Sequence, residues 1–170
     1  MEWHMFSRGQ FFLGALAQLI AGMLDYKKGN VFGATAFCAY GLFWFAMAIS
    51  WLINMGALGA KLQENVDTRQ MGIAFVGYLI LTLFLTIGAI KTNKVLFFIF
   101  VFIDVLFLGL SVSTLTAEGM IKTAFHNVTA YAELAIALLS FYGSGANVLN
   151  NHFDRALLPI GKPFEVFSNR

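Results

Sequence analysis

Polar side chains interrupt the long apolar stretches of this 170-residue sequence, and they are the groups best able to do chemistry there. Asp104 falls near the middle of one such stretch, where an ionised carboxylate in a bilayer would cost about 2.5–3.5 kcal/mol. We expect Asp104 to be protonated, paired or facing water, either as a hydrogen bond between helices or as a proton-titrating group beside a pore. Glu133 lies within one turn of the expected start of its helix, where a carboxylate needs no special role. The six candidates are Gln18, Asn54, Asp104, Glu133, Asn147 and Asn150.

These groups sit on apolar segments long enough to cross a bilayer, since a transmembrane helix needs about 20 residues at 1.5 Å rise per residue. Backbone polar groups in lipid must bond within their own segment, and the segments lack the period-two alternation of a membrane β-barrel. The sequence therefore predicts an all-α fold, a polytopic membrane helix bundle that forms a single domain over residues 1–170. Its five predicted spans are Gly9–Tyr26, Val31–Asn54, Gln70–Ile90, Val95–Leu115 and Ala130–Leu149.

Composition and motifs argue against the other common classes of protein. Hydrophobic residues make up 59% of the chain and charged residues only 12%, which does not suit a soluble domain. The net charge of +2 does not imply nucleic acid, because the basic residues sit in the loops. The three histidines, His4, His126 and His152, are scattered and lack metal-ligand spacing, and the single Cys38 reads as an inert packed thiol. No catalytic or nucleotide-binding motif is present, so we expect no enzyme, no cofactor and no metal.

The distribution of lysine and arginine predicts the orientation in the membrane. One side holds the turns Lys27–Asn30 and Lys91–Lys94 and the C-terminal tail, with seven positive residues. The other side holds the N-terminus and the loops Met55–Arg69 and Thr116–Thr129, with four. Because the more positive side faces the cytoplasm, we expect the C-terminus inside and the N-terminus outside.

Two stretches resemble a known family. The first runs from Ala17 to Phe37 and reads AQLIAGMLDYKKGNVFGATAF; the second comprises VLN at 148–150, Phe153, Arg155 and LPIG at 158–161. They are similar to the acetate uptake transporter family, the succinate–acetate permeases (SatP/YaaH), and the resemblance covers roughly Gly9 to Gly161.

The resemblance implies a six-helix protomer, a homo-hexamer, and passage of acetate, related monocarboxylates or succinate with protons. It matches Tyr40 to the tyrosine of a narrow apolar gate and places Ile103 where the family has leucine. The phenylalanine of that gate and an NPAPLGL motif belong to the family's first helix and have no counterpart in this sequence. The sequence is therefore expected to be either a fragment or a five-helix relative. Asp104 and Asn147 also depart from the family, which has an uncharged residue and a carboxylate there.

We therefore predict a proton-linked transporter or channel for acetate and related small carboxylates in the plasma or inner membrane. Amide and tyrosine donors closed by an apolar gate suit a small monoanion. The predicted partners are a small carboxylate, the lipid bilayer and further copies in a homo-hexamer, with no nucleic acid. Symport and passive channel conduction both stay open, and the alternative is a non-transporting membrane assembly subunit derived from the same family. The predicted pathway residues are Gln18, Tyr40, Ile103 and Asn150, with Asp104 as the proton-coupling candidate.

Overall fold

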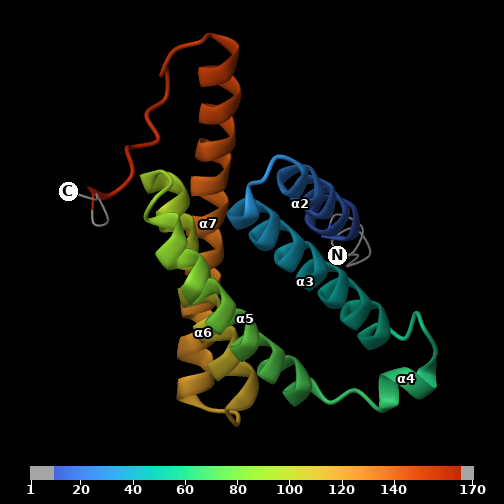
Figure 1. Ribbon diagram of the computed structural model, residues 1–170. Helices are drawn as coiled ribbons and strands as arrows, with labels where there is room; N and C mark the ends of the chain where they lie inside the picture. Colours follow the sequence, from blue (N-terminus) through green and yellow to red (C-terminus); the bar gives the residue numbers. More distant parts are fainter. Residues whose placement is uncertain (1–9, 166–170) are drawn as a thin grey trace. The chain divides into compact units, whose positions relative to one another are not determined.

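The computed structural model describes residues 10–165, and this range contains helices and no strand, which confirms the predicted all-α fold (Figure 1). The chain divides into two compact units, residues 1–67 and 68–170, and each is described by itself. The single domain stays a prediction. The first unit holds the π-helix η1 (Gln10–Ala17) and the α-helices α2 (Gln18–Lys27), α3 (Val31–Asn54) and α4 (Ala60–Glu64); the second holds α5 (Thr68–Ala89), α6 (Lys94–Leu115) and α7 (Met120–His152).

Four of the described helices are long and apolar enough to cross a membrane: α3, α5 from Arg69, α6 and α7. The remaining predicted span, Gly9–Tyr26, corresponds to η1 and α2, which follow one another without a break from Gln10 to Lys27. Apolar side chains remain widely exposed on the long helices, as expected for surfaces that meet lipid.

The turn between α2 and α3 is held by side chains of the first family-like stretch. Gly29 has φ 74°, a left-handed conformation that other residues adopt at a cost. Asn30 caps α3, because its Oδ1 accepts a hydrogen bond from the Gly33 backbone N–H at 3.1 Å. Its Nδ2 donates to Asp25 Oδ2 at 3.0 Å, and a Cβ on Gly33 would collide with that same carboxylate. The residues that carry the resemblance here are therefore the ones that build the turn.

Glycines let α2 and α3 approach closely along their length (Figure 1). A Cβ at Gly22 would lie 2.5 Å from the Cys38 sulfur, and one at Gly41 would lie 2.9 Å from Leu19 Cγ. Small residues allow such close backbone packing in membranes, where dispersion contacts rather than the hydrophobic effect hold helices together. Cys38 is a free thiol packed against α2.

In the second unit α6 packs between α5 and α7. Phe107 of α6 is 1% exposed, and its ring stacks on Tyr78 of α5 with 5.5 Å between the ring centroids. On its other side, α6 offers Gly109 to α7, where a Cβ would collide with the Thr129 hydroxyl. Helix α6 thus packs against each of its two neighbours on a separate face.

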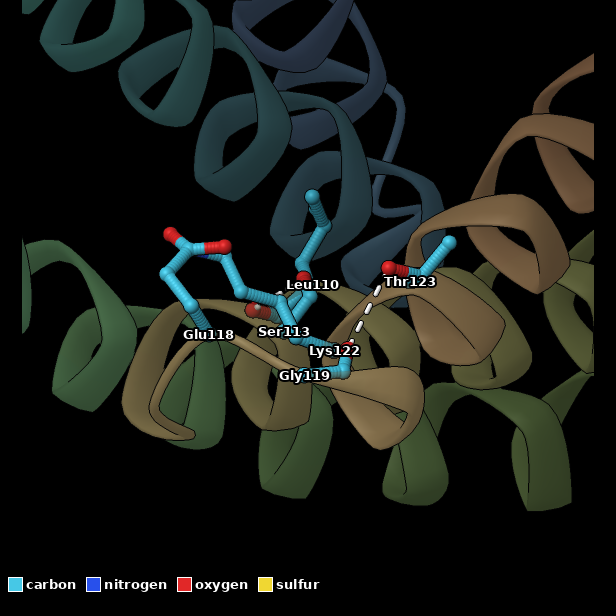
Figure 2. A network of polar contacts seen from close by, with 6 residues as sticks. All are labelled: Leu110, Ser113, Glu118, Gly119, Lys122 and Thr123. Carbon is cyan, nitrogen blue, oxygen red and sulfur yellow. Dashed lines mark hydrogen bonds and ion pairs between the residues drawn. The ribbon is translucent and has the colours of Figure 1, made fainter.

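The last helix begins ten residues earlier than predicted. The sequence indicated a loop over Thr116–Thr129, but α7 starts at Met120, and only 116–119 lie between α6 and α7. The residues from 120 to 129 include polar side chains but neither glycine nor proline, so nothing breaks the helix. Figure 2 shows the turn, where Lys122 pairs with Glu118 and the Thr123 hydroxyl donates to the Gly119 carbonyl at 3.2 Å. Hydropathy marks the most apolar part of a helix and does not report where the helix ends.

The segment after α7 folds back toward the turn between α5 and α6 (Figure 1). The backbone N–H of Val95 donates to Ile160 at 3.2 Å, and that of Phe164 donates to Ile90 at 3.0 Å. The Phe164 ring meets Phe97 edge-on at 4.9 Å. Gly161 has φ 77°, and a Cβ there would lie 2.8 Å from the Lys94 side chain. The LPIG sequence therefore fastens the tail to the helices.

Candidate functional site

Asp104 is paired with a hydroxyl on the neighbouring helix. It lies half-buried on α6, and its Oδ2 is 2.6 Å from Thr86 Oγ1 on α5. Thr86 Oγ1 is in turn 3.0 Å from the backbone carbonyl of Thr82. The sequence-based expectation that Asp104 must be protonated, paired or water-facing is met by this contact. Its partner on α5 was not predicted, because the register of one helix against another does not follow from either helix alone.

The contacts among Asp104, Thr86 and the Thr82 carbonyl depend on which oxygen atoms carry a hydrogen. The Thr86 hydroxyl has one hydrogen, so it cannot donate to both the Asp104 carboxylate and the Thr82 carbonyl. If Asp104 is protonated, it donates to Thr86, which then donates to Thr82, and every contact is satisfied. The other carboxyl oxygen, Oδ1, is buried without a hydrogen-bond partner among the described residues, and a neutral carboxyl tolerates that better than an ionised one. The geometry therefore accommodates a carboxylic acid that can exchange a proton.

The two predicted gate residues lie on different units of the chain. Tyr40 is half-buried on α3, and Ile103 is half-buried on α6 beside Asp104. Each is described within its own unit, and no distance joins them. The gate stays a prediction.

Gln18, the first residue of α2, has an amide oxygen that is buried without a hydrogen-bond partner among the described residues. It stands four residues before Gly22, and residues four apart share a helix face, so Gln18 lies on the side of α2 that faces α3. Buried polar atoms are normally satisfied, and an exception calls for a water, an ion or a ligand. The oxygen accepts hydrogen bonds and therefore suits a water molecule, whereas only the amide N–H groups of Gln18 can donate to a carboxylate, and the place of Gln18 in the pathway stays a prediction.

Near the end of α7, the side chain of Asn150 binds the backbone of the segment that follows the helix. Its Nδ2 donates to the Leu158 carbonyl at 2.8 Å, and its Oδ1 accepts from the Leu158 N–H at 3.0 Å. The Tyr142 hydroxyl adds a hydrogen bond to the Pro159 carbonyl at 2.7 Å. The amide of Asn150 thus holds the returning tail, and its place in the pathway stays a prediction.

Sequence reasoning also missed a polar face of α7. The prediction placed Glu133 within one turn of the start of its helix, and this is wrong. Helix α7 starts at Met120, so Glu133 lies 13 residues beyond the start. His126 likewise lies on the helix rather than in a loop. The spacing of seven residues from His126 to Glu133 and on to Ser140 was the available signal, since it keeps side chains on one face.

The described residues thus form a multi-pass helical membrane protein with a few hydrogen-bonding groups inside its spans, the class to which transporters and channels belong. The family model for the GPR1/FUN34/yaaH family matches residues 4–159. The chain belongs to that family, which confirms the resemblance.

Proteins similar to this chain include one from a bacterium and one from a fungus. The chain is 34% identical over 151 residues to the succinate–acetate/proton symporter SatP of Escherichia coli K12, covering 89% of this chain and 76% of the relative. It is 28% identical to acetate permease A of Emericella nidulans, covering 88% of this chain and 53% of that protein. The structure of the bacterial acetate channel SatP matches with a TM-score of 0.73 and 34% identity, over 93% of this chain and 83% of that one. These relatives are transporters and a channel, in agreement with the prediction that the chain is not an enzyme.

Proposed function

We propose that the protein carries acetate and related small carboxylates, including succinate, across the plasma or inner membrane. The observation that carries this proposal is the match to the bacterial acetate channel at 34% identity over 93% of the chain. The side chains in the family-like stretches support it, since Asn30 and Asn150 hold the helix ends that fix this fold. We place the C-terminus in the cytoplasm, because seven of the eleven positive residues lie on that side, and propose the homo-hexamer implied by the family resemblance.

The proton linkage is proposed to run through Asp104. Its contact with Thr86 and the further contact with the Thr82 carbonyl suit a protonated carboxyl. A neutral Asp104 does not repel a passing carboxylate, whereas an ionised one does. Protonation of Asp104 would therefore favour passage of the anion and couple it to the proton. We propose Gln18 as a hydrogen-bond donor along the pathway and Asn150 near its cytoplasmic end.

The transport proposal is tested with purified protein in liposomes. Uptake of labelled acetate should exceed that of empty liposomes and saturate or follow the imposed gradient. If the natural protein has the further N-terminal helix implied by the resemblance, that form is the one to assay. Correctly folded protein with no uptake above empty liposomes would refute transport and favour the non-transporting assembly subunit.

The proton linkage has its own pair of variants. Asp104→Asn keeps the shape of the carboxyl group and removes its exchangeable proton. Uptake by the parent should fall as the pH is raised from about 5 to about 8, and uptake by the variant should fall less over the same range. Thr86→Val is the matched variant, because it removes the bonded hydroxyl but keeps the carboxyl group, and it should shift the pH profile without flattening it. Superimposable profiles for the parent and Asp104→Asn would remove Asp104 from the mechanism.

The gate is tested by widening it. Tyr40→Ala and Ile103→Ala should admit larger carboxylates such as lactate, since each removes bulk from a predicted constriction. Folded variants with an unchanged substrate profile would show that both side chains only pack between helices.

A further inference from the structure

The tail after α7 brings one lysine close to another at the start of α6. Lys94 is the first residue of α6, and its aliphatic stem lies against the tail, since a Cβ on Gly161 would be 2.8 Å from the Lys94 Cβ and 2.9 Å from its Cγ and Cδ. The Lys94 Nζ lies 5.6 Å from the centre of the Phe164 ring. Lys162 stands on the tail between these two contacts and is exposed. Two positive residues are therefore held within one short stretch of backbone.

A third lysine belongs to the same patch. The backbone N–H of Phe164 donates to the Ile90 carbonyl at 3.0 Å, and the exposed Lys91 follows Ile90 directly. Within residues 90–95 and 160–165 the sequence has one acidic residue, Glu165, so three positive charges stand beside one negative charge. Like charges held this close repel one another, and a bound anion offsets that repulsion. These three exposed residues form a lysine cluster: Lys91, Lys94 and Lys162.

The lysine cluster lies at the ends of two candidate membrane spans. Helix α5 ends at Ala89 and α6 begins at Lys94, and both helices are long and apolar enough to cross a bilayer. Phe98 stands one turn after Lys94 on the same side of α6, and its side chain is 46% exposed. This side of α6 therefore offers a positive group at the helix end and an apolar surface next to it. A phospholipid has the matching groups in the same order, a headgroup phosphate followed by acyl chains.

The turn between α2 and α3 provides a comparison within the same chain. Its Lys27 and Lys28 carry two positive charges on the same side of the membrane in the predicted topology. The positive-inside rule explains the lysines of both turns, but it does not require a tail to bring a further lysine to one of them. The hydrogen bonds of the tail fix the backbone of the lysine cluster before any ligand arrives. Such preorganisation lowers the cost of binding and favours a defined site.

We propose that the lysine cluster binds the headgroup phosphate of an anionic phospholipid, with an acyl chain lying along α6 at Phe98. Lysine binds phosphate as a point charge, and basic pockets at the ends of membrane helices hold anionic headgroups. The bound headgroup fastens the tail to the turn, because Lys162 comes from the tail and the other two lysines come from the turn and the start of α6. The inference does not depend on which solute the protein carries.

Lipid binding to the purified full-length protein in neutral detergent tests the proposal. The protein is titrated with phosphatidylglycerol or phosphatidylcholine, and native mass spectrometry measures the lipid bound per chain. The parent should bind its first phosphatidylglycerol at least about tenfold more tightly than phosphatidylcholine, since each lysine near an anionic lipid strengthens binding about fivefold. Phosphatidylglycerol should also raise Tm more than phosphatidylcholine does, because a ligand that binds the folded state stabilises it.

Matched double variants separate the lysine cluster from positive charge in general. Lys91→Gln with Lys162→Gln leaves the packed Lys94 stem in place and should weaken phosphatidylglycerol binding at least about tenfold. Lys27→Gln with Lys28→Gln removes the same charge from the other turn and should leave that affinity unchanged. Lys91→Arg with Lys162→Arg keeps the charge and should bind as the parent does, which shows that the glutamine variant fails through lost charge. Phosphatidylglycerol should slow chymotrypsin cleavage of the tail in the parent but not in the glutamine variant of the lysine cluster.

Other results would contradict the proposal. Unchanged phosphatidylglycerol affinity in Lys91→Gln with Lys162→Gln would place the bound lipid elsewhere, and equal weakening by the two glutamine double variants would leave only general attraction. If soluble glycerol phosphate raised the Tm of the parent as much as phosphatidylglycerol does, the ligand would be a soluble phosphate and not a lipid. Protein that binds phosphatidylglycerol through the lysine cluster but takes up no acetate would refute the proposed function and support the lipid site.

Discussion

Replacing Asn150 separates a structural clamp from a pathway residue. Asn150→Ala removes two hydrogen bonds to the Leu158 backbone, of 2.8 and 3.0 Å. Each such bond contributes about 0.5–1.5 kcal/mol, and Leu158 is left with two part-buried groups unsatisfied, so we expect a loss of about 2–3 kcal/mol. For a chain of this size that lowers Tm by roughly 4–12 °C. Tyr142→Phe, which removes the single bond to Pro159, should cost about half as much or less.

Thermal unfolding in detergent and limited proteolysis of the tail measure the effect. Asn147→Ala is the control for losing an exposed amide from the same helix, and its Tm should stay near that of the parent. Asn150→Asp is more informative, because its carboxylate still accepts from the Leu158 N–H but repels the Leu158 carbonyl. It should be destabilised at neutral pH and partly recover in acid, where a protonated carboxyl can donate again. A Tm for Asn150→Ala that matches Asn147→Ala would refute the clamp.

Three further outcomes are expected in the rest of the chain. Asn30→Ala loses the N-cap of α3 and should destabilise the protein by about 1–2 kcal/mol in thermal unfolding; an unchanged Tm would contradict the cap. Gly22→Ala should cost about 1–3 kcal/mol, because the added Cβ lies 2.5 Å from the Cys38 sulfur, and Cys38→Ala should restore part of the loss if that contact is the cause. In the Cys38→Ser background, an impermeant thiol reagent applied to intact cells should label Ala117→Cys and spare Thr92→Cys, and the reverse pattern would invert the proposed topology.

The helical fold follows from the sequence because lipid leaves the backbone few alternatives. Long apolar runs must bond their own N–H and C=O groups, so hydropathy predicted the spans and the all-α class. It failed at α7, where the helix extends beyond its most apolar part to include polar residues such as Lys122 and His126. Hydropathy reports where a segment sits relative to lipid, whereas helix ends depend on caps and breakers.

The candidate site could be predicted only in part, and Asp104 shows why. Its cost in lipid can be calculated from the residue type alone, so the need for a partner was evident. Its partner Thr86 depends on how α5 and α6 align, which is fixed by contacts such as the stacking of Tyr78 on Phe107. Residue type states what a side chain requires, and only packing states which neighbour supplies it.

The residues that carry the family resemblance stabilise the fold and do not select the solute. Asn30 caps a helix, Asn150 clamps the tail, and Gly161 permits a turn against Lys94. These roles fix the fold and would be needed whatever solute the protein carries. Polar groups inside the spans, such as Asp104 and Gln18, instead carry a cost that must be offset by a proton, a partner or water. The choice of solute and its coupling to protons should therefore be sought at those positions rather than in the shared motifs.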